Sequence, residues 1–430
     1  MVQGGTTRRR VLQTGCAVVG GALWAGSGRP ATAQTNETWP QFRYDTANTG
    51  AAPANTGPTA AVTQHWAVGT GGKVRSSPTV VDGVAYVGSS DGTVYALAVA
   101  DGTERWTFDT DAVDSESDFG VFPSPAVVDN TVYVAGIDRH LYALDSATGV
   151  EQWAFPTRDV VLSSPTVVDD TVYLGSYDAS VYAVGARDGT KQWAFETGDF
   201  VYSSPAVVDG TVYIGSGDAR VYAINAADGT QRWAFETGEF VYASPAVVDG
   251  IVYVGSHDTN VYAIDAANGT ERWTAGTDDP VFSSPAVVDD TVYIGSTDNR
   301  VYAFATGDGG LHWDFTTGGS VSSSAAVVDD TVYIGSHDAT VYALDAATGT
   351  ERWSFETGGF VHSSPAVVDG LVLVGSGDST VYALVDRSAT PAAPPTEVEP
   401  SPTAATPGEA TTAPAVAPPT DSPAVPEGTP

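Results

Sequence analysis

Alternating carboxylates form one candidate metal site in the sequence. They are Asp109, Asp111, Asp114, Glu116 and Asp118. Ca²⁺ binds about six to eight oxygen ligands, and a flexible acidic loop can supply them. The spacing differs from that of an EF-hand loop, however, and no glycine stands where that loop turns sharply. Two interpretations stay open, a cation site and a solvated acidic loop, and we favour the solvated loop.

No set of residues has the pattern of a catalytic centre. The 6 histidines are scattered, and no recognisable nucleophile, base and oxyanion arrangement accompanies them. His257 and His337 follow Gly-Ser and precede Asp at two corresponding places. A zinc site would require both imidazoles within a few ångströms of one ion. We therefore expect neither a catalytic residue nor a histidine metal site.

Tryptophan recurs at a fixed spacing and marks the elements that must position any site. The common step is 40 residues, and the step from Trp106 to Trp153 is 47 because the acidic loop is inserted there. A fixed period of this length indicates one supersecondary unit copied many times. The repeated residues are Trp66, Trp106, Trp153, Trp193, Trp233, Trp273, Trp313 and Trp353.

Each repeat contains four short segments rich in Val, Tyr, Ile, Phe or Trp, which indicates four β-strands. Asp209-Gly210 and Asp228-Gly229 separate such segments, and Asp-Gly supplies the positive φ that a tight hairpin needs. One repeat is therefore a four-stranded antiparallel meander, the size of a propeller blade. In the repeat that ends near Trp233, the expected strands are Val201–Val208, Thr211–Gly215, Arg220–Asn225 and Gln231–Glu236.

Counting the repeats predicts how the ring closes. A Ser-Pro signature, or Ser-Ala at Ala325, marks 8 first strands, and the tryptophans mark 8 fourth strands. The two sets are out of phase, because Trp66 precedes the first signature and no tryptophan follows the last. We expect Val62–Val68 to complete the blade formed by residues 362–384, which removes exposed sheet edges. The predicted fold is an all-β, eight-bladed propeller closed by an N-terminal strand.

The segment from Ala143 to Trp153, with Asp145 and Gly149, resembles the tryptophan-docking motif of the PQQ-like eight-bladed propellers. The resemblance covers residues 39–386, and it implies that the tryptophan of each blade packs against the neighbouring blade. We expect apolar packing alone to hold the tryptophans of blades that lack the docking Asp. That Asp is present at Asp145, Asp265 and Asp345 and replaced by Ala98, Gly185, Asn225 and Ala305.

The family so resembled has a catalytic and a non-catalytic branch. Its quinoprotein dehydrogenases hold PQQ and Ca²⁺ over the ring's axis, need catalytic insertions, and in many cases carry a disulfide of adjacent cysteines. This sequence has one cysteine, Cys16, and no insertion large enough to wall a cofactor. The resemblance therefore favours the non-catalytic branch, which includes the lipoprotein propeller of bacterial outer-membrane assembly, and implies neither PQQ nor Ca²⁺ as cofactor.

One position at the start of each innermost strand varies, whereas the valine before it is constant. Variation on a constant frame is what a ligand-facing ring would show, and Arg75, Phe122, Tyr202, Tyr242, Phe282 and His362 would then contact the ligand. The alternative is that these side chains fill gaps between blades, and we favour that alternative. The eight residues are Arg75, Phe122, Leu162, Tyr202, Tyr242, Phe282, Ser322 and His362.

Charge disfavours nucleic acid as a partner. The chain has 52 Asp and Glu against 18 Lys and Arg, for a formal net charge of -34. Such a field repels phosphates. An acidic surface with two lysines, Lys73 and Lys191, is similar to the surfaces of proteins from extreme halophiles.

The two ends of the chain indicate export. Arg8-Arg9-Arg10, an apolar stretch and Ala31-Thr-Ala33 resemble a Tat-type signal peptide over residues 1–33. Lipid attachment at Cys16 is a weaker alternative. Residues 34–57 form an N-terminal segment before the propeller at 58–386, and residues 387–430 form a Pro-, Thr- and Ala-rich tail that we expect to be disordered. We expect no transmembrane segment.

These features predict a monomeric, exported, non-enzymatic propeller that acts as a binding or scaffolding module at the cell surface. The partner is an unidentified protein or surface ligand. Two alternatives stay open. One is a PQQ-dependent oxidoreductase, and the other is a carbohydrate or peptide receptor that uses the aromatic ring at the central funnel.

Overall fold

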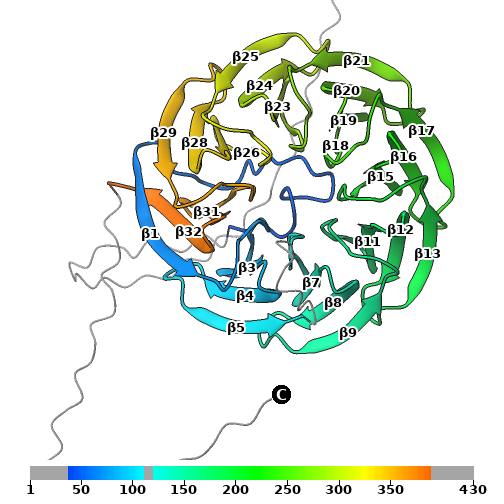
Figure 1. Ribbon diagram of the computed structural model, residues 1–430, viewed down its shortest axis with the longest axis horizontal. Coiled ribbons are helices and arrows are strands. Elements are labelled where there is room, and N and C mark those ends of the chain that lie inside the picture. Colours follow the sequence, from blue (N-terminus) through cyan, green and yellow to red (C-terminus); the bar gives the residue numbers. More distant parts are fainter. Residues whose placement is uncertain (1–36, 111–119, 389–430) are drawn as a thin grey trace, which may run out of the picture. The chain divides into compact units, whose positions relative to one another are not determined.

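Short hydrogen-bonded strands make up all the regular structure in the computed structural model, which describes residues 37–110 and 120–388. Eight four-stranded antiparallel sheets surround a common axis as the blades of a propeller, as predicted (Figure 1). The predicted signal peptide, Cys16, the tail from residue 389 and acidic-loop residues 111–119 lie outside the described residues. Within the described ranges, no helix has the length and hydropathy needed to span a membrane.

The first four blades follow one another along the chain, each with its first strand nearest the axis. Their strands are β2 (Thr79–Val81), β3 (Val84–Gly88), β4 (Thr93–Ala98) and β5 (Glu104–Asp109); β6 (Ala126–Val128), β7 (Thr131–Ala135), β8 (His140–Asp145) and β9 (Glu151–Pro156); β10 (Thr166–Val168), β11 (Thr171–Ser176), β12 (Ser180–Gly185) and β13 (Lys191–Glu196); β14 (Ala206–Val208), β15 (Thr211–Ser216), β16 (Arg220–Asn225) and β17 (Gln231–Glu236).

The last four blades repeat this order until the final blade takes its outer strand from the start of the chain. Their strands are β18 (Ala246–Val248), β19 (Ile251–Gly255), β20 (Asn260–Asp265) and β21 (Glu271–Gly276); β22 (Ala286–Val288), β23 (Thr291–Ser296), β24 (Arg300–Ala305) and β25 (Leu311–Thr316); β26 (Ala326–Val328), β27 (Thr331–Gly335), β28 (Thr340–Asp345) and β29 (Glu351–Glu356); β30 (Ala366–Val368), β31 (Leu371–Ser376), β32 (Thr380–Asp386) and β1 (Val62–Gly69).

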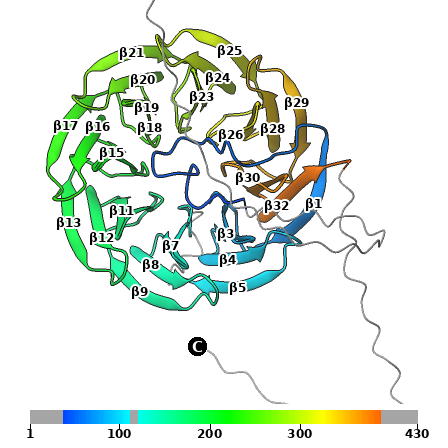
Figure 2. The same cartoon turned by 180° about the vertical axis from the view of Figure 1, so that it is seen from behind.

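Ring closure occurs where the sequence predicted it. β1 pairs antiparallel with β32, and Trp66 lies opposite Ala383. A bulge between Gln64 and Trp66 matches the bulge that every other blade has between its third and fourth strands. Figures 1 and 2 show blue β1 along the outer edge of orange β32.

Two local predictions were wrong. The first strand of the fourth blade is Ala206–Val208 rather than Val201–Val208, because Pro205 has no N–H and the Ser204 N–H donates to a serine side chain of the next blade instead of to a ladder. Asp209 and Gly210 form the expected tight turn, with φ of 48° and 67°. At Asp228-Gly229, only Gly229 has positive φ, and the loop is longer because the Asp228 carboxylate accepts a hydrogen bond from Thr230 N–H.

The tryptophans join neighbouring blades at the outer edge of the ring. The indole N–H of Trp233 donates to the carbonyl of Ala266 in the next blade, and a Cβ at Gly269 would lie 2.8 Å from this indole. All eight tryptophans donate to a backbone carbonyl at 2.7–3.1 Å. We call these residues the tryptophan belt: Trp66, Trp106, Trp153, Trp193, Trp233, Trp273, Trp313 and Trp353.

The expectation that some blades would dock tryptophan by apolar packing alone is therefore wrong. The acceptor is main-chain oxygen, which every residue type provides, so the hydrogen bond survives in blades without the docking Asp. The docking Asp instead stabilises a loop of its own blade. The Asp145 carboxylate accepts hydrogen bonds from the backbone N–H groups of Ala147 and Thr148, which holds its own loop.

An aspartate recurs after the second strand of each blade, and in most blades it binds the loop that enters the blade. The Asp218 carboxylate accepts hydrogen bonds from the Tyr222 hydroxyl at 2.5 Å and from the Gly198 N–H at 2.6 Å. Gly198 lies in the loop that enters this blade from the previous one, so the aspartate fastens the loop between blades. The same pair of contacts occurs at Asp178, Asp258, Asp298, Asp338 and Asp378.

Candidate functional site

Residues 37–57, which we call the strap, cross one end of the axis and contact the first strand of every blade (Figure 2). Trp39 exchanges two backbone hydrogen bonds with Val80. The equivalent valine N–H groups of later blades donate to strap oxygens, with Val207 bonding to Thr46 and Val287 to Thr49. The strap thus satisfies the backbone groups that the innermost strands present to the axis.

Buried polar side chains hold the strap in place. The Arg43 guanidinium donates to the carbonyls of Ala325 and Pro285, and burial lowers its pKa to about 9. Asn48 donates to the carbonyls of Pro205 and Pro245, at 3.1 and 3.2 Å. One asparagine and one arginine thus bridge four blades, which closes this end of the axis.

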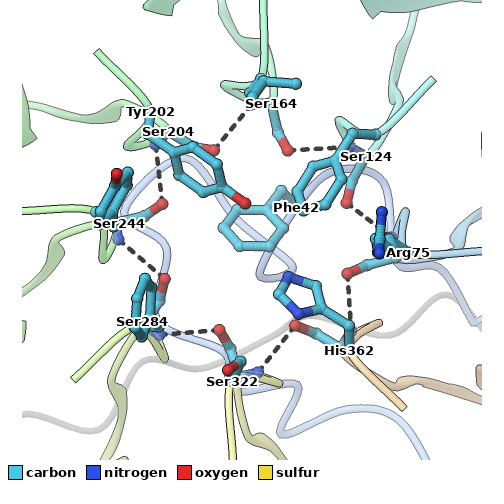
Figure 3. A pocket seen from close by; sticks show the side chains of 17 residues that line it. Phe42, Arg75, Ser124, Ser164, Tyr202, Ser204, Ser244, Ser284, Ser322 and His362 are labelled. Carbon is cyan, nitrogen blue, oxygen red and sulfur yellow. Dashed lines mark hydrogen bonds between the residues drawn. The ribbon is translucent and has the colours of Figure 1, made fainter. Parts of the chain in front are cut away.

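A closed ring of eight hydrogen bonds lies next along the axis (Figure 3). The backbone N–H of Ser204 donates to Ser244 Oγ in the next blade at 2.9 Å, and each equivalent serine does the same. Ser364 completes the ring by donating to Ser77 Oγ, also at 2.9 Å. We call these residues the serine ring: Ser77, Ser124, Ser164, Ser204, Ser244, Ser284, Ser324 and Ser364.

The variable residues predicted to form a ligand-facing ring gather directly beyond the serine ring. Phe122 contacts Tyr202 at a centroid distance of 5.8 Å and His362 at 5.3 Å, although the three come from the second, fourth and eighth blades. These three residues therefore meet across the axis and narrow it to a neck, whereas Tyr242 contacts the variable residues Tyr202 and Phe282 of the adjacent blades. All eight variable residues line the space at the axis.

The space enclosed at the axis is small. The strap residue Phe42 forms its floor, the serine ring its wall and the variable residues its neck, and the cavity has a volume of about 60 Å³ (Figure 3). Pockets for small organic ligands usually measure roughly 300–1,000 Å³. The axial cavity is therefore smaller than most pockets for small organic ligands.

On one side of the neck, half-buried aromatic rings of the third to sixth blades form a continuous surface that includes the neck residues Tyr202, Tyr242 and Phe282. Tyr242 is its centre and lies 4.9–5.5 Å from the rings of Phe200, Tyr202, Phe240 and Phe282. We call this group, with Tyr177 against Phe200, the aromatic patch. Exposed carboxylates border it at Asp199, Glu239 and Asp279.

The opposite side of the neck carries nitrogen groups. The Arg75 guanidinium lies 5.3 Å from the Phe360 ring, and the rings of His337 and His362 are 5.8 Å apart. Burial, with smaller contributions from His337 and Arg75, lowers the pKa of His362 to about 3. Burial likewise lowers the pKa of His337. The imidazoles are therefore neutral at ordinary pH, and Arg75 is the charged group of this side.

The remaining residues considered as metal ligands lie at separate places. Asp109 ends β5 and accepts a hydrogen bond from Thr93, and its four acidic-loop partners lie outside the described residues. His257 packs against Phe240 and Phe282, whereas His337 packs against Phe360 and His362, so the two imidazoles have different neighbours. In residues 37–110 and 120–388, no group of three His, Cys, Asp or Glu side chains could hold a metal ion.

Two features of the site were missed by the sequence analysis. The serine ring had a visible signal, since the serine of the Ser-Pro or Ser-Ala signature recurs in every repeat, but the signature also marks the first strand and only that use was considered. The strap had a weaker signal in Arg43 and Asn48, polar residues at positions that prove to be buried. Nothing local shows that they bind carbonyls of distant blades.

Comparisons with known proteins agree with this architecture. The family model described as outer membrane protein assembly factor BamB matches residues 59–133, 110–233, 198–319 and 297–392. No curated protein matches the sequence. The solved structure of BamB from Moraxella catarrhalis is similar, with a TM-score of 0.64 and 19% identity over 76% of this chain and 99% of that one.

Two dehydrogenases are similar in fold as well. A europium-containing methanol dehydrogenase has a TM-score of 0.70 and 14% identity over 81% of this chain and 98% of that one. The quinohemoprotein alcohol dehydrogenase from Comamonas testosteroni has a TM-score of 0.69 and 17% identity over 82% and 81%. Identities this low establish a shared fold alone. The family model, in contrast, covers most of the sequence, and the chain belongs to the family of the outer membrane protein assembly factor BamB.

Proposed function

We propose that this propeller is a non-enzymatic scaffold that binds another protein through the aromatic patch. The observation that carries the proposal is the group of half-buried rings around Tyr242, which gather on one side of the funnel. Partly exposed aromatic groups in a cluster mark protein interfaces more often than isolated ones do. Membership of the BamB family supports a role in protein binding.

The border of the patch favours a particular partner chemistry. Asp199, Glu239 and Asp279 lie beside the rings, within a chain of net charge -34. Carboxylates attract Lys and Arg, and aromatic faces bind both apolar groups and cations. The partner segment that fits best therefore combines basic residues with aliphatic or aromatic ones.

Export to the cell surface belongs to the same proposal. It depends on the arginines at 8–10 and the small residues before Gln34, which resemble a Tat-type signal. Replacing Arg8 and Arg9 by lysine should leave the protein inside the cell. Fractionation with antibody detection measures this, and unchanged export of the variant would contradict the Tat route.

Photocrosslinking from within the patch tests the binding site directly. A benzoylphenylalanine at position 242 should crosslink to one partner in the native envelope, and the same group at position 311 should not. Leu311 is 53% exposed on an outer strand and supplies a matched apolar position away from the funnel. Equal crosslinking from both positions would refute the patch as the interface.

A double variant then separates binding from folding. Tyr202→Ala with Tyr242→Ala should abolish capture of the crosslinked partner and leave the melting curve nearly intact. Leu311→Ala with Val150→Ala removes comparable exposed apolar surface and should leave capture unchanged. Retained capture by the tyrosine variant would overturn the proposal.

The dehydrogenase structures with the same fold make a quinoprotein oxidoreductase the second candidate. The small axial cavity argues against it. Titration of the purified protein with PQQ and Ca²⁺ distinguishes the two. Stoichiometric retention of quinone absorbance together with dye-linked alcohol oxidation would replace the scaffold proposal.

A further inference from the structure

The serine ring presents hydrogen-bond donors to the axial cavity. Each serine Oγ accepts one N–H from the preceding blade, at 2.9–3.1 Å. A hydroxyl also carries one donor hydrogen. For these eight serines, the structure shows no acceptor for that hydrogen among the described residues, and all eight are at most 9% exposed. Buried polar groups are nearly always hydrogen-bonded, so the donors are suited to a ligand inside the cavity.

The charge around the cavity selects the sign of that ligand. The lining consists of Phe42, the serine ring and the variable residues, and Arg75 supplies its one formal positive charge while no Asp or Glu contributes. This composition contrasts with the chain as a whole, where 52 acidic residues outnumber 18 basic ones. A cation such as Ca²⁺ usually binds carboxylate oxygens, and no Asp or Glu is among the described residues that line the cavity.

The size of the cavity limits the ligand further. A water molecule needs roughly 10–15 Å³ of such space, so a cavity of about 60 Å³ admits a few waters or one small ion. The aromatic neck and Phe42 exclude larger organic groups. Hydroxyl donors, one guanidinium and a small volume suit a monovalent inorganic anion.

We propose that the serine ring and Arg75 bind a small inorganic anion of the halide class in the axial cavity. The anion accepts hydrogen bonds from neighbouring ring hydroxyls, and the guanidinium at the neck compensates its charge. The site does not depend on the proposed partner, although Tyr202, Tyr242 and Phe282 of the aromatic patch also line the cavity. It stabilises the ring from within, because an anion that bonds to serines of adjacent blades ties those blades together.

Bromide is the probe for this site. Crystals of the full chain grown in sodium bromide should show an anomalous peak on the axis, between Phe42 and the neck. In solution, the chloride NMR linewidth should show excess broadening that bromide removes at constant ionic strength. An axis that holds water alone in bromide crystals, with no excess broadening, would overturn the proposal.

Arg75→Gln tests the charge without altering the serine ring. It should weaken bromide binding by about tenfold or more, the expected loss for one charge-assisted contact. Arg105→Gln removes an exposed arginine of β5 and should leave bromide binding unchanged. Equal affinity of the two variants would refute the role of Arg75.

A pair of serine variants tests the hydroxyls with a matched control. Ser204→Ala with Ser284→Ala removes two ring hydroxyls, each of which also accepts one buried N–H. Ser203→Ala with Ser283→Ala removes two buried hydroxyls that accept N–H from Gly215 and Gly295 but do not line the cavity. Both pairs should lower the melting temperature similarly. The ring pair alone should lose bromide binding, and equal binding by both pairs would contradict the proposal.

Discussion

The outer edge of this propeller is built from repeated contacts, whereas the neck at its axis is built from contacts that occur once. At the outer edge, the same residue makes the same contact eight times, as each tryptophan donates to a carbonyl of the next blade. At the axis, one structural position holds eight side chains of six residue types, from Arg75 to His362. The edge is therefore a repeated structural joint, whereas the axis carries features that occur once.

We expect the repeated contacts to contribute mainly to stability and the contacts that occur once to contribute mainly to binding. A repeated joint contributes through its number, and losing one of eight leaves the others in place. A single feature such as the contact of Phe122 with His362 has no copy elsewhere. Changes at the belt should therefore alter unfolding and spare binding, and changes at the neck or patch should do the reverse. The following experiments test that division, beginning with the one expected to have the largest effect.

Removing β1 should have the largest effect, because it opens the ring. A chain that begins at Thr70 lacks the strap and the partner of β32, which leaves a long unpaired edge. We expect loss of cooperative unfolding, a cost of more than about 5 kcal/mol, which is comparable with the whole stability of many domains. Thermal unfolding followed by circular dichroism measures this.

A rearranged chain sharpens the result. Placing residues 59–69 after Arg387 through a short glycine turn restores the pairing of β1 with β32 without the strap. This variant should regain a cooperative transition at lower temperature than the native chain, since the strap bonds are still missing. Failure of the rearranged chain to fold would show that the axis, and not the edge, closes the ring.

A single tryptophan should matter less. Trp233→Ala removes a buried indole and should lower the free energy of unfolding by about 3–5 kcal/mol, as large aromatic truncations do. Trp233→Phe keeps most of the packing and loses the hydrogen bond to Ala266, a cost of about 1 kcal/mol from that bond. Urea denaturation measures both. If Trp193→Ala differs from Trp233→Ala by several kcal/mol, the joints are not equivalent.

The aspartates between blades should give a smaller effect. Asp218→Ala leaves the Tyr222 hydroxyl and the Gly198 N–H without their shared acceptor and should cost about 1–3 kcal/mol. Tyr222→Phe removes one of the two bonds and should cost less. Denaturation curves of both variants measure the difference. A larger cost for the tyrosine variant would show that the Tyr222 hydroxyl, and not the Asp218 carboxylate, is the main group that holds this loop.

The last expected effect is seen only in acid and is a dependence of stability on pH at the neck. His362 has a pKa of about 3 in the folded protein, against an ordinary value of 6.5. Between these values the unfolded chain binds a proton that the folded chain does not, so stability falls as pH falls. His362→Leu should reduce the slope of the unfolding free energy against pH between pH 6.5 and pH 3. The reduction should correspond to up to about one bound proton. An unchanged slope would show that His362 is solvated.

The repeat allowed most of the fold to be predicted. Strands such as Arg220–Asn225 and Gln231–Glu236 have the expected bounds, because β-branched residues and turn residues alternate there. The blade closed by Trp66 was also predictable, because a phase difference between two repeating marks needs no three-dimensional information. Position 122, by contrast, contacts positions 202 and 362 across the axis, and only the closed ring brings these residues together.

Other parts of the site could not be predicted for a related reason. The bonds from Arg43 to Ala325 and from Asn48 to Pro205 join residues far apart in sequence, and they depend on carbonyls whose exposure to the axis follows from the blade geometry. The tryptophan hydrogen bonds were misjudged because side chains were considered as acceptors, whereas the acceptor is the main chain. Periodicity in the sequence predicts only contacts that are repeated. The strap occurs once in the chain, so its contacts could not be predicted in this way.

The pairing of β1 with β32 also determines when the propeller can close during synthesis. Arg387 reaches the carbonyl of Val62 although 325 positions separate them. A ribosome adds roughly 5–20 residues per second, so the first strand emerges some tens of seconds before its partner is synthesised. The nascent chain must therefore keep an unsatisfied β-strand soluble throughout translation, and the finished toroid can form only after release of its final segment.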